Sequence, residues 1–342
     1  MYLFKLIFIS LLFSTSLFSL DYTQKPEVKK FIKEMHQKFN YKEAYLQKIF
    51  KNIRKSPYIK PTSTTPPSPR ATTTNSHITV KKIKRGPWER YRAQNIEQNR
   101  TKLGARFMQE HNRTLEEVYK LYGVEPEYIV AIIGIESYYG KNMGRYYVFD
   151  QLTHLAFDEG KSNRLYRYEL QEFLRLCYRE QLEPRAIKGS ASGAIGLGQF
   201  LPSNYQKFAI DYNRDGKVRM SNADDAIASI ANYFYQHKWM RNTPVAVRVS
   251  YKGNRFYGLK TGTKYKYHRK NLIGIYPKVP FNYREKVMLI KLERAKYDEL
   301  WYGTDNFYVL TRYNHSSYYA MAVHQLAKKI KKEFNLLHTP IK

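Results

Sequence analysis

The sequence of 342 residues contains a single cysteine, Cys177, so the chain can form no internal disulfide. Cys177 falls in the apolar repeat of Phe173 and Leu174, and we therefore expect a buried, inert thiol and no catalytic one. No cysteine stands directly after the apolar N-terminal run, so we expect no lipid anchor there. Zinc-finger spacing, an RRM-like aromatic motif and the GxxxxGK[ST] phosphate loop are also absent.

Acidic residues are few, with 29 Asp and Glu against 59 Lys and Arg, which gives a net charge of +30. A charge of this size attracts polyanions, for which nucleic acid, acidic lipid and anionic wall polymers are candidates. Because the basic residues are spread along the chain and no nucleic-acid motif occurs, we expect no nucleic-acid partner. The chain has 32 Tyr, whose apolar rings with polar tips suit sugar-binding clefts, although most of them are expected to be ordinary core and surface residues.

The apolar run within residues 1–20 is short for a membrane span, and polar residues interrupt it. Lys5 precedes the run and small residues follow it, which is the pattern of a secretory signal peptide. We therefore expect export to the periplasm, with cleavage near Ser19 or Leu20. A retained N-terminal anchor is the alternative.

The rest of the chain divides by composition and periodicity. Apolar residues at helical spacing, among them Val28, Phe31 and Ile32, predict helices. The alternation at Val247 and Val249 and short apolar runs predict strands. The predicted segments are an N-terminal helical segment at 21–59, a Pro/Ser/Thr-rich linker at 60–85, a helical core at 86–243, a small antiparallel β subdomain at 244–310 with strand-like runs at 287–292 and 307–310, and a C-terminal helix within 311–342 that packs on the core. The predicted fold class is mainly α with a small β subdomain.

The segment PEYIVAIIGIESYYG, residues 126–140, predicts a helix with one carboxyl on its apolar face. Pro126 suits the first helical turn, and Ile132 and Ile133 precede Glu136 at helical spacing. Burial raises the pKa of such a carboxyl and keeps it protonated near neutral pH, which is the state that a general acid requires. From these residues alone, the alternative is a buried Glu paired with an Arg.

Residues 188–209 hold four glycines within ten residues, at Gly189, Gly193, Gly196 and Gly198. Glycines so close together indicate a backbone that another group approaches closely. The alternative is tight helix–helix packing through small residues. Ser190 and Gln199 of the same segment are neutral hydrogen-bonding groups suited to sugar hydroxyls and amides.

The segment DYNRDGKVRMSNADD, residues 211–225, matches the first half of an EF-hand calcium loop. The matching residues are Asp211, Asn213, Asp215 and Gly216. Val218 supplies the expected apolar residue, but Asn222 stands where a bidentate Glu is expected. A longer loop would close at Asp224 or Asp225, and a turn without metal is the alternative.

Together and in this order, these segments resemble the membrane-bound lytic transglycosylase B family of peptidoglycan-cleaving enzymes. The matching pieces are ERYR at 89–92, GIESYYG at 134–140, GSASGAIGLGQFLPS at 189–203, the Asp-rich loop, DAIASIANYF at 225–234 and NFYVLTRYNHS at 306–316. The resemblance covers about residues 86–330, and more weakly the helices at 26–54. Any one of these motifs could occur by chance, but six of them in the order of the family make the resemblance specific to that family.

The resemblance implies a lysozyme-like helical core in which Glu136 is the catalytic acid and base. It implies a sugar cleft lined by Tyr91, Ser190, Gln199, Tyr233, Tyr313 and Asn314. It also implies a structural calcium ion bound by Asp211, Asn213, Asp215, the backbone carbonyl of Lys217, and Asp225. The sequence departs from the family in lacking a lipidated Cys, in its linker, and in the positive charges of Arg214 and Lys217, which we expect to weaken calcium binding.

The activity implied is that of a lytic transglycosylase, which cleaves the bond between N-acetylmuramic acid and N-acetylglucosamine in peptidoglycan strands and leaves a 1,6-anhydro end without a catalytic cofactor. Ordinary glycosidases use two carboxylates, whereas the motif supplies one, so the substrate must provide the other groups. A hydrolase of the same fold, a non-catalytic wall-binding module and a basic membrane- or nucleic-acid-binding protein are the alternatives. We expect a periplasmic monomer, peripherally associated with the envelope and not a lipoprotein.

Overall fold

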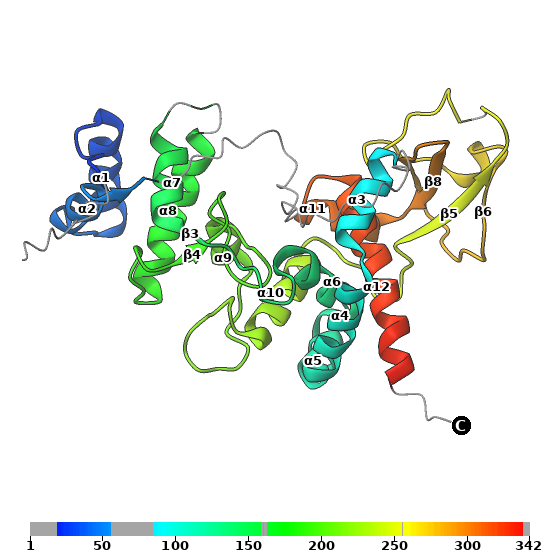
Figure 1. Cartoon of the computed structure of the whole chain (residues 1–342), viewed down its shortest axis with the longest axis horizontal. Helices are drawn as coiled ribbons and strands as arrows, with labels where there is room; N and C mark the ends of the chain where they lie inside the picture. The colour runs from blue at the N-terminus through cyan, green and yellow to red at the C-terminus, as the bar shows by residue number, and fades with distance from the viewer. Residues whose placement is uncertain (1–18, 56–84, 159, 161–162, 255, 338–342) are drawn as a thin grey trace, which may run out of the picture.

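The computed structural model describes residues 19–55, 85–158, 160, 163–254 and 256–337. Most of the predicted signal segment and of the linker therefore lies outside the described residues. Figure 1 shows an elongated molecule, with the N-terminal helices at one end, a small sheet at the other and the remaining helices between them. The predicted fold class, mainly α with a small β subdomain, is confirmed.

The N-terminal segment consists of β1 (Ser19–Leu20), α1 (Pro26–Phe39), α2 (Glu43–Phe50) and β2 (Ile53–Arg54), and β1 pairs antiparallel with β2. The apolar faces of α1 and α2 share one buried cluster with α7 (Val148–Phe157) and α8 (Asn163–Arg179). Cys177 lies in this cluster, where burial raises the pKa of its thiol, so the prediction of a buried thiol is confirmed.

The helical core surrounds α6 (Pro126–Ser137), whose residues from Tyr128 to Gly134 are all buried. The remaining core elements are α3 (Pro87–Asn95), α4 (Gln98–Glu110), α5 (Asn112–Tyr122), β3 (Tyr146–Tyr147), β4 (Lys188–Gly189), α9 (Pro202–Phe208), α10 (Ala223–Gln236), α11 (Asp305–Tyr313) and α12 (Ser317–Leu337). Helix α6 contacts α4, α5, α10 and α12, so its C-terminal end is fixed from several sides.

The β subdomain is a four-stranded antiparallel sheet in the order β6–β5–β8–β7. Its elements are β5 (Ala246–Tyr251), the 3-10 helix η1 (Arg269–Asn271), β6 (Ile275–Pro277), β7 (Met288–Glu293) and β8 (Asp298–Gly303). Val247 and Val249 point into its own apolar cluster, as their alternation predicted.

The strand predicted at residues 307–310 is wrong, because these residues belong to helix α11. Phe307, Val309, Leu310 and Thr311 are buried, whereas Tyr308 and Arg312, four positions apart, are exposed, as expected for the outer face of a helix. An apolar run of four residues is too short to distinguish this spacing from a buried strand.

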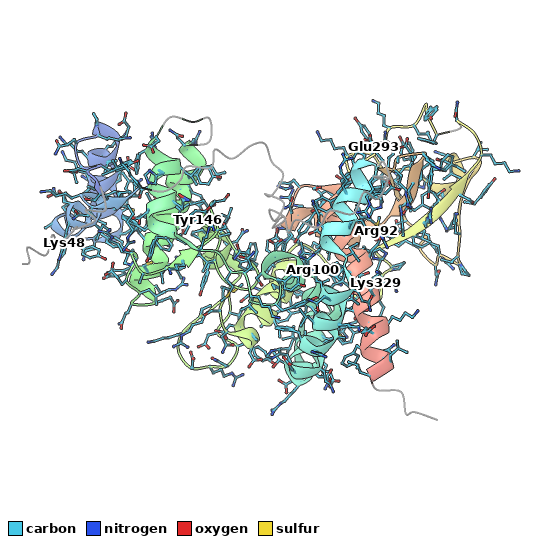
Figure 2. The ribbon with its side chains drawn as sticks, viewed as in Figure 1. Lys48, Arg92, Arg100, Tyr146, Glu293 and Lys329 are labelled. Atoms are coloured by element: carbon cyan, nitrogen blue, oxygen red, sulfur yellow. The ribbon has the colours of Figure 1, made fainter. Side chains whose placement is uncertain are left out.

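Basic side chains are distributed over all parts of the molecule, as Figure 2 shows for Lys48 on α2, Arg92 on α3 and Lys329 on α12. This distribution differs from the single basic face that many nucleic-acid-binding domains present. Within the described residues, no helix combines the length and the apolar character needed to cross a membrane.

Candidate active site

Glu136 occupies the last turn of α6, three and four positions after the buried residues Ile133 and Ile132. Burial raises the pKa of its carboxyl from 4.5 to about 7, although a hydrogen bond from Tyr319 opposes the rise. Within the described residues Glu136 has no ion-pair partner, so the alternative of a salt bridge with an Arg is not what the structure contains. The carboxyl is therefore largely protonated up to about neutral pH.

Tyr319 is a site residue that the sequence analysis missed. It lies in the first turn of α12, is 1% exposed, and its hydroxyl donates a hydrogen bond of 2.5 Å to Oε1 of Glu136, 183 positions earlier in the chain. The available signal was the apolar spacing of Tyr319, Val323 and Leu326, which turns the tyrosine inward. No sequence pattern indicated which residue its hydroxyl would meet.

Two of the predicted cleft tyrosines lie close to Glu136. Tyr313 stacks on Tyr319 with ring centroids 6.4 Å apart and planes 7° from parallel, and its hydroxyl donates to the carbonyl of Gly198 at 2.5 Å. Burial raises the pKa of Tyr91 to about 12, and the charge of Glu136 adds to the rise. The same two causes raise the pKa of Tyr313. The carboxyl is thus bordered by aromatic side chains from α3, α11 and α12.

Ser190 and Gln199 each keep one hydrogen-bonding function that the described residues do not use. Ser190 Oγ accepts from the backbone N–H groups of Ser192 at 3.2 Å and Ala194 at 3.0 Å, which leaves its hydroxyl hydrogen to donate. Gln199 Nε2 donates to the carbonyls of Met143 at 3.0 Å and Gly196 at 2.8 Å, which leaves its Oε1 to accept. The pair could therefore bind the carbonyl and the N–H of one amide group.

The other two predicted cleft residues, Tyr233 and Asn314, each form a hydrogen bond to the backbone of a neighbouring segment. Tyr233 is 4% exposed, and its hydroxyl donates to the backbone carbonyl of Arg312 at 2.6 Å. This hydroxyl therefore holds α10 against α11, and the ring packs on Tyr313. Asn314 is half-buried at the C-terminal end of α11, and its carbonyl accepts from the N–H of Ser316 at 2.7 Å.

The glycines of residues 189–198 allow the protein's own segments to approach. A Cβ on Gly196, whose φ is +78°, would lie 2.4 Å from the backbone oxygen of Met220, and one on Gly198 would lie 2.9 Å from the hydroxyl of Tyr313. The alternative of helix–helix packing is wrong for these residues, because none of them lies in a helix: Gly189 belongs to β4, Gly193 to irregular chain, and Gly196 and Gly198 to a turn. The glycines instead permit loops to pack closely.

The turn after Glu136 is fixed by the packing of the Tyr139 ring between α4 and α6. Tyr138 and Tyr139 have φ of +53° and +59°, a left-handed conformation that costs of order 1–3 kcal/mol per non-glycine residue. The Tyr139 ring fits between two glycines: a Cβ on Gly134 of α6 or on Gly104 of α4 would each lie 2.4 Å from its hydroxyl oxygen. That hydroxyl donates to the carbonyl of Arg100 at 2.9 Å. The contacts of the ring thus keep the end of α6 in one position.

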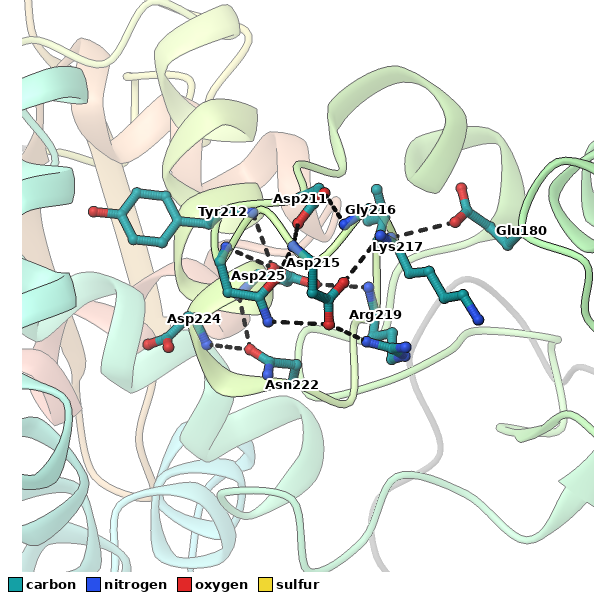
Figure 3. Close-up of polar contacts among 12 residues, drawn as sticks. Glu180, Asp211, Tyr212, Asp215, Gly216, Lys217, Arg219, Asn222, Asp224 and Asp225 are labelled. Atoms are coloured by element: carbon teal, nitrogen blue, oxygen red, sulfur yellow. Dashed lines mark hydrogen bonds and ion pairs between the residues drawn. The ribbon is translucent and has the colours of Figure 1, made fainter.

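The Asp-rich loop at residues 211–225 lies outside this site and ends in the first turn of α10. Figure 3 shows its carboxylates bonded to the backbone N–H groups of the loop itself. Asp211 accepts from Gly216 at 2.9 Å, and Asp225 accepts from Tyr212 at 2.9 Å and from Arg219 at 2.8 Å. These bonds wrap residues 211–219 around the fully buried carboxylate of Asp225.

The donor chemistry of the loop fits calcium, with one obstacle. Oxygen ligands are available, Gly216 at the sixth position has a φ of +83°, and the buried Asp225 has no ion-pair partner within the described residues. No group of three His, Cys, Asp or Glu side chains in the described residues could hold a metal by itself, so Asn213 and the Lys217 carbonyl would have to contribute. The obstacle is Arg219, whose guanidinium forms an ion pair with Asp215.

A helical core that positions one protonated carboxyl among aromatic side chains, with a small β subdomain beside it, defines a lysozyme-like glycan-cleaving enzyme. Comparison with known proteins agrees. The chain belongs to the transglycosylase SLT domain family, whose pattern matches residues 23–328. It is a lytic murein transglycosylase, an enzyme of peptidoglycan cleavage.

Three relatives show how far the similarity extends. The chain is 34% identical over 320 residues to membrane-bound lytic murein transglycosylase B of Escherichia coli, which covers 91% of this chain and 84% of the relative. The Escherichia coli lytic transglycosylase Slt35, solved in complex with calcium, superposes with a TM-score of 0.81 at 31% identity, over 94% of this chain and 98% of that one. SltB3 from Pseudomonas aeruginosa, solved in complex with NAG-NAM-pentapeptide, superposes with a TM-score of 0.67 at 28% identity, over 72% of this chain and 67% of that one.

Proposed function

We propose that Glu136 is the acid and the base of the transglycosylase reaction. In the first step the protonated carboxyl donates its proton to the glycosidic oxygen that follows N-acetylmuramic acid. The support for this role is the pKa of about 7, which keeps the proton on Glu136 near neutral pH while leaving it acidic enough to be transferred. The hydrogen bond from Tyr319 then stabilises the carboxylate that forms.

In the second step the carboxylate of Glu136 takes the proton of the 6-hydroxyl of the same sugar. The bond between the anomeric carbon and the leaving sugar has already broken in the first step. The hydroxyl oxygen therefore attacks the anomeric carbon, and a 1,6-anhydro ring results without addition of water. The attack is intramolecular, so proximity favours it. The reaction needs no second carboxylate in the protein, because the N-acetyl group of the substrate stabilises the positive charge at the anomeric carbon.

Ser190 and Gln199 orient that N-acetyl group in this proposal. The free hydroxyl hydrogen of Ser190 donates to the acetyl oxygen, and the free Oε1 of Gln199 accepts from the amide N–H. Tyr91 and Tyr313 supply the aromatic walls against which sugar rings pack. Asn314 and the ring of Tyr233 complete the proposed cleft.

Digestion of purified peptidoglycan, followed by mass analysis of the products, tests the reaction. The expected fragments are one water lighter than those of a hydrolase. Normal reducing ends would show instead that water is the nucleophile, and an absence of products would indicate a wall-binding role. Glu136→Gln keeps the size of the side chain and removes the acid, so a variant with the wild-type rate would contradict the assignment of Glu136.

We also propose that the 211–225 loop binds one structural calcium ion through Asp211, Asn213, Asp215, the Lys217 carbonyl and Asp225. The ion would neutralise the buried carboxylate of Asp225, and Arg219 would have to leave Asp215 to admit it. Competition from this guanidinium is a reason to expect weaker binding than in a loop without it.

For the location of the enzyme, we propose export to the periplasm by the N-terminal segment, without a lipid anchor. Peripheral attachment to the envelope is consistent with the net charge of +30. We expect the protein to act as a monomer on glycan strands.

A further inference from the structure

Three large apolar side chains are exposed along strand β6, at one edge of the small sheet. Ile273, in the turn before the strand, is 76% exposed, Tyr276 within it 62%, and Val279 just after it 58%. Since a chain extends by at most about 3.6 Å per residue, Ile273 and Val279 lie within about 22 Å of each other. A single exposed apolar side chain is ordinary, whereas a group of them indicates a surface that contacts something apolar.

The fold holds this edge in a defined position. Strand β6 pairs with β5 alone within the described ranges, and Figure 1 shows it at the end of the molecule opposite α1 and α2. Ile275 of the strand is buried in the apolar cluster of the sheet, and Gly274, with a φ of +82°, forms the turn that precedes it. We refer to residues 269–280, from η1 to the end of this apolar stretch, as the β6 edge.

The charge of the β6 edge is entirely positive. Arg269, Lys270 and Lys278 are exposed, and residues 269–280 contain no Asp or Glu. Lys270 and Lys278 have no ion-pair partner within the part of the chain that the structure describes. Surfaces that bind anionic lipid combine these two properties, because the cations attract the headgroups and the apolar side chains enter the bilayer.

Two features disfavour a protein partner at this edge. A strand added to β6 would hydrogen-bond its backbone groups, but β6 has only three residues and Pro277 has no N–H to donate. Lysine is also depleted in protein–protein interfaces, whereas it is favoured beside lipid phosphates. The chemistry of the edge therefore favours a lipid surface.

We propose that the β6 edge attaches the enzyme to a membrane surface that contains anionic phospholipid. Ile273 and Val279 enter the boundary between headgroups and acyl chains, and Tyr276 lies at headgroup level, where tyrosine is enriched in membrane proteins. Lys270 and Lys278 bind the lipid phosphates, each contributing a factor of about five in affinity. The proposal assigns a surface and a lipid class to the peripheral attachment proposed above, and it rests on that location.

Flotation of the full chain with phospholipid vesicles tests the proposal. One set of vesicles contains phosphatidylglycerol and phosphatidylcholine in equal parts, and the other contains phosphatidylcholine alone. The first variant is Lys270→Gln with Lys278→Gln. Its control is Lys29→Gln with Lys33→Gln, two exposed residues of α1 at the other end of the molecule. All of these proteins share the N-terminal apolar run, so any contact of that run with lipid is the same in each.

A second variant, Ile273→Ser with Val279→Ser, removes apolar surface from the β6 edge without changing its charge. Its control is Leu121→Ser with Leu336→Ser, two leucines of α5 and α12 that are exposed to a similar degree. The two variants together separate the electrostatic contribution from the apolar one.

On anionic vesicles the lysine variant is expected to bind about 30-fold more weakly than the wild type, and the serine variant about tenfold more weakly. Both controls should bind nearly as the wild type does, and vesicles of phosphatidylcholine alone should bind every protein weakly. Equal binding by either variant and its control, or equally tight binding to both sets of vesicles, would overturn the proposal.

Binding to peptidoglycan sacculi distinguishes the wall from the membrane as the partner of the β6 edge. Variants that lose binding to sacculi while keeping it to vesicles would also overturn the proposal, because the edge would then contact the wall. Vesicle binding requires no glycan, so the transglycosylase reaction is judged separately from the masses of its products, and export is judged separately by cell fractionation.

Discussion

The raised pKa of Glu136 has a consequence for stability that can be measured without any substrate. In the unfolded chain a glutamate titrates near 4.5, whereas in the folded protein the pKa is about 7. The folded state therefore holds the proton more tightly, so its stability is fully present below pH 4.5 and is lost as the pH rises through about 7. The difference between the two pKa values corresponds to about 3 kcal/mol at pH 8.

Glu136→Gln removes this titration and keeps the shape of the side chain and an acceptor for Tyr319. Urea unfolding, followed by the fluorescence of the buried Trp88 and Trp239, should give a variant that gains about 3 kcal/mol on the wild type between pH 4.5 and pH 8. The control is Glu110→Gln, at an exposed position of α4, which should show no comparable gain. If the variant and the control follow the same pH dependence, the carboxyl is not held protonated by the fold, and the reasoning is refuted.

Three further predictions concern neighbouring features. Tyr319→Phe removes a bond that favours the ionised carboxyl, so the fall of kcat/KM at alkaline pH should move up by about one pH unit; an unchanged profile would contradict this role. Gly134→Ala forces a Cβ against Tyr139 and should lower the free energy of unfolding by about 1–3 kcal/mol and reduce activity, whereas Gly258→Ala, with nothing within 4 Å, should not. Calcium at about 100 times its Kd should raise the free energy of unfolding by about 2.7 kcal/mol over a sample with chelator, and Asp225→Asn should abolish the difference; an equal response in the variant would place the ion elsewhere.

Local patterns were sufficient to predict most of the elements. The spacing of Val28, Phe31 and Ile32 predicted α1, and the alternation of Val247 and Val249 predicted β5. They failed at residues 307–310, where four apolar residues fit a helix and a strand equally well. The periodicity of a long segment determines its structure, whereas that of a short run does not.

The site was predicted only in the part that local sequence carries. Glu136 could be placed at the end of an apolar helix, and burial implied its raised pKa. Its partner Tyr319 could not be predicted, because no rule of spacing connects residues on two helices far apart in the chain. The same limit applies to Arg219, whose pairing with Asp215 depends on the folded loop, whereas the sequence drew attention to Arg214 and Lys217.

The distance along the chain between Glu136 and Tyr319 also determines when during biosynthesis the site can exist. The hydroxyl that bonds the acid belongs to α12, and Tyr319 is synthesised 183 positions after Glu136. A chain that is cut or stalled before α12 lacks the wall that buries the carboxyl and the donor that stabilises its ionised form. The carboxyl can therefore acquire its buried and hydrogen-bonded setting only after α12 has been made.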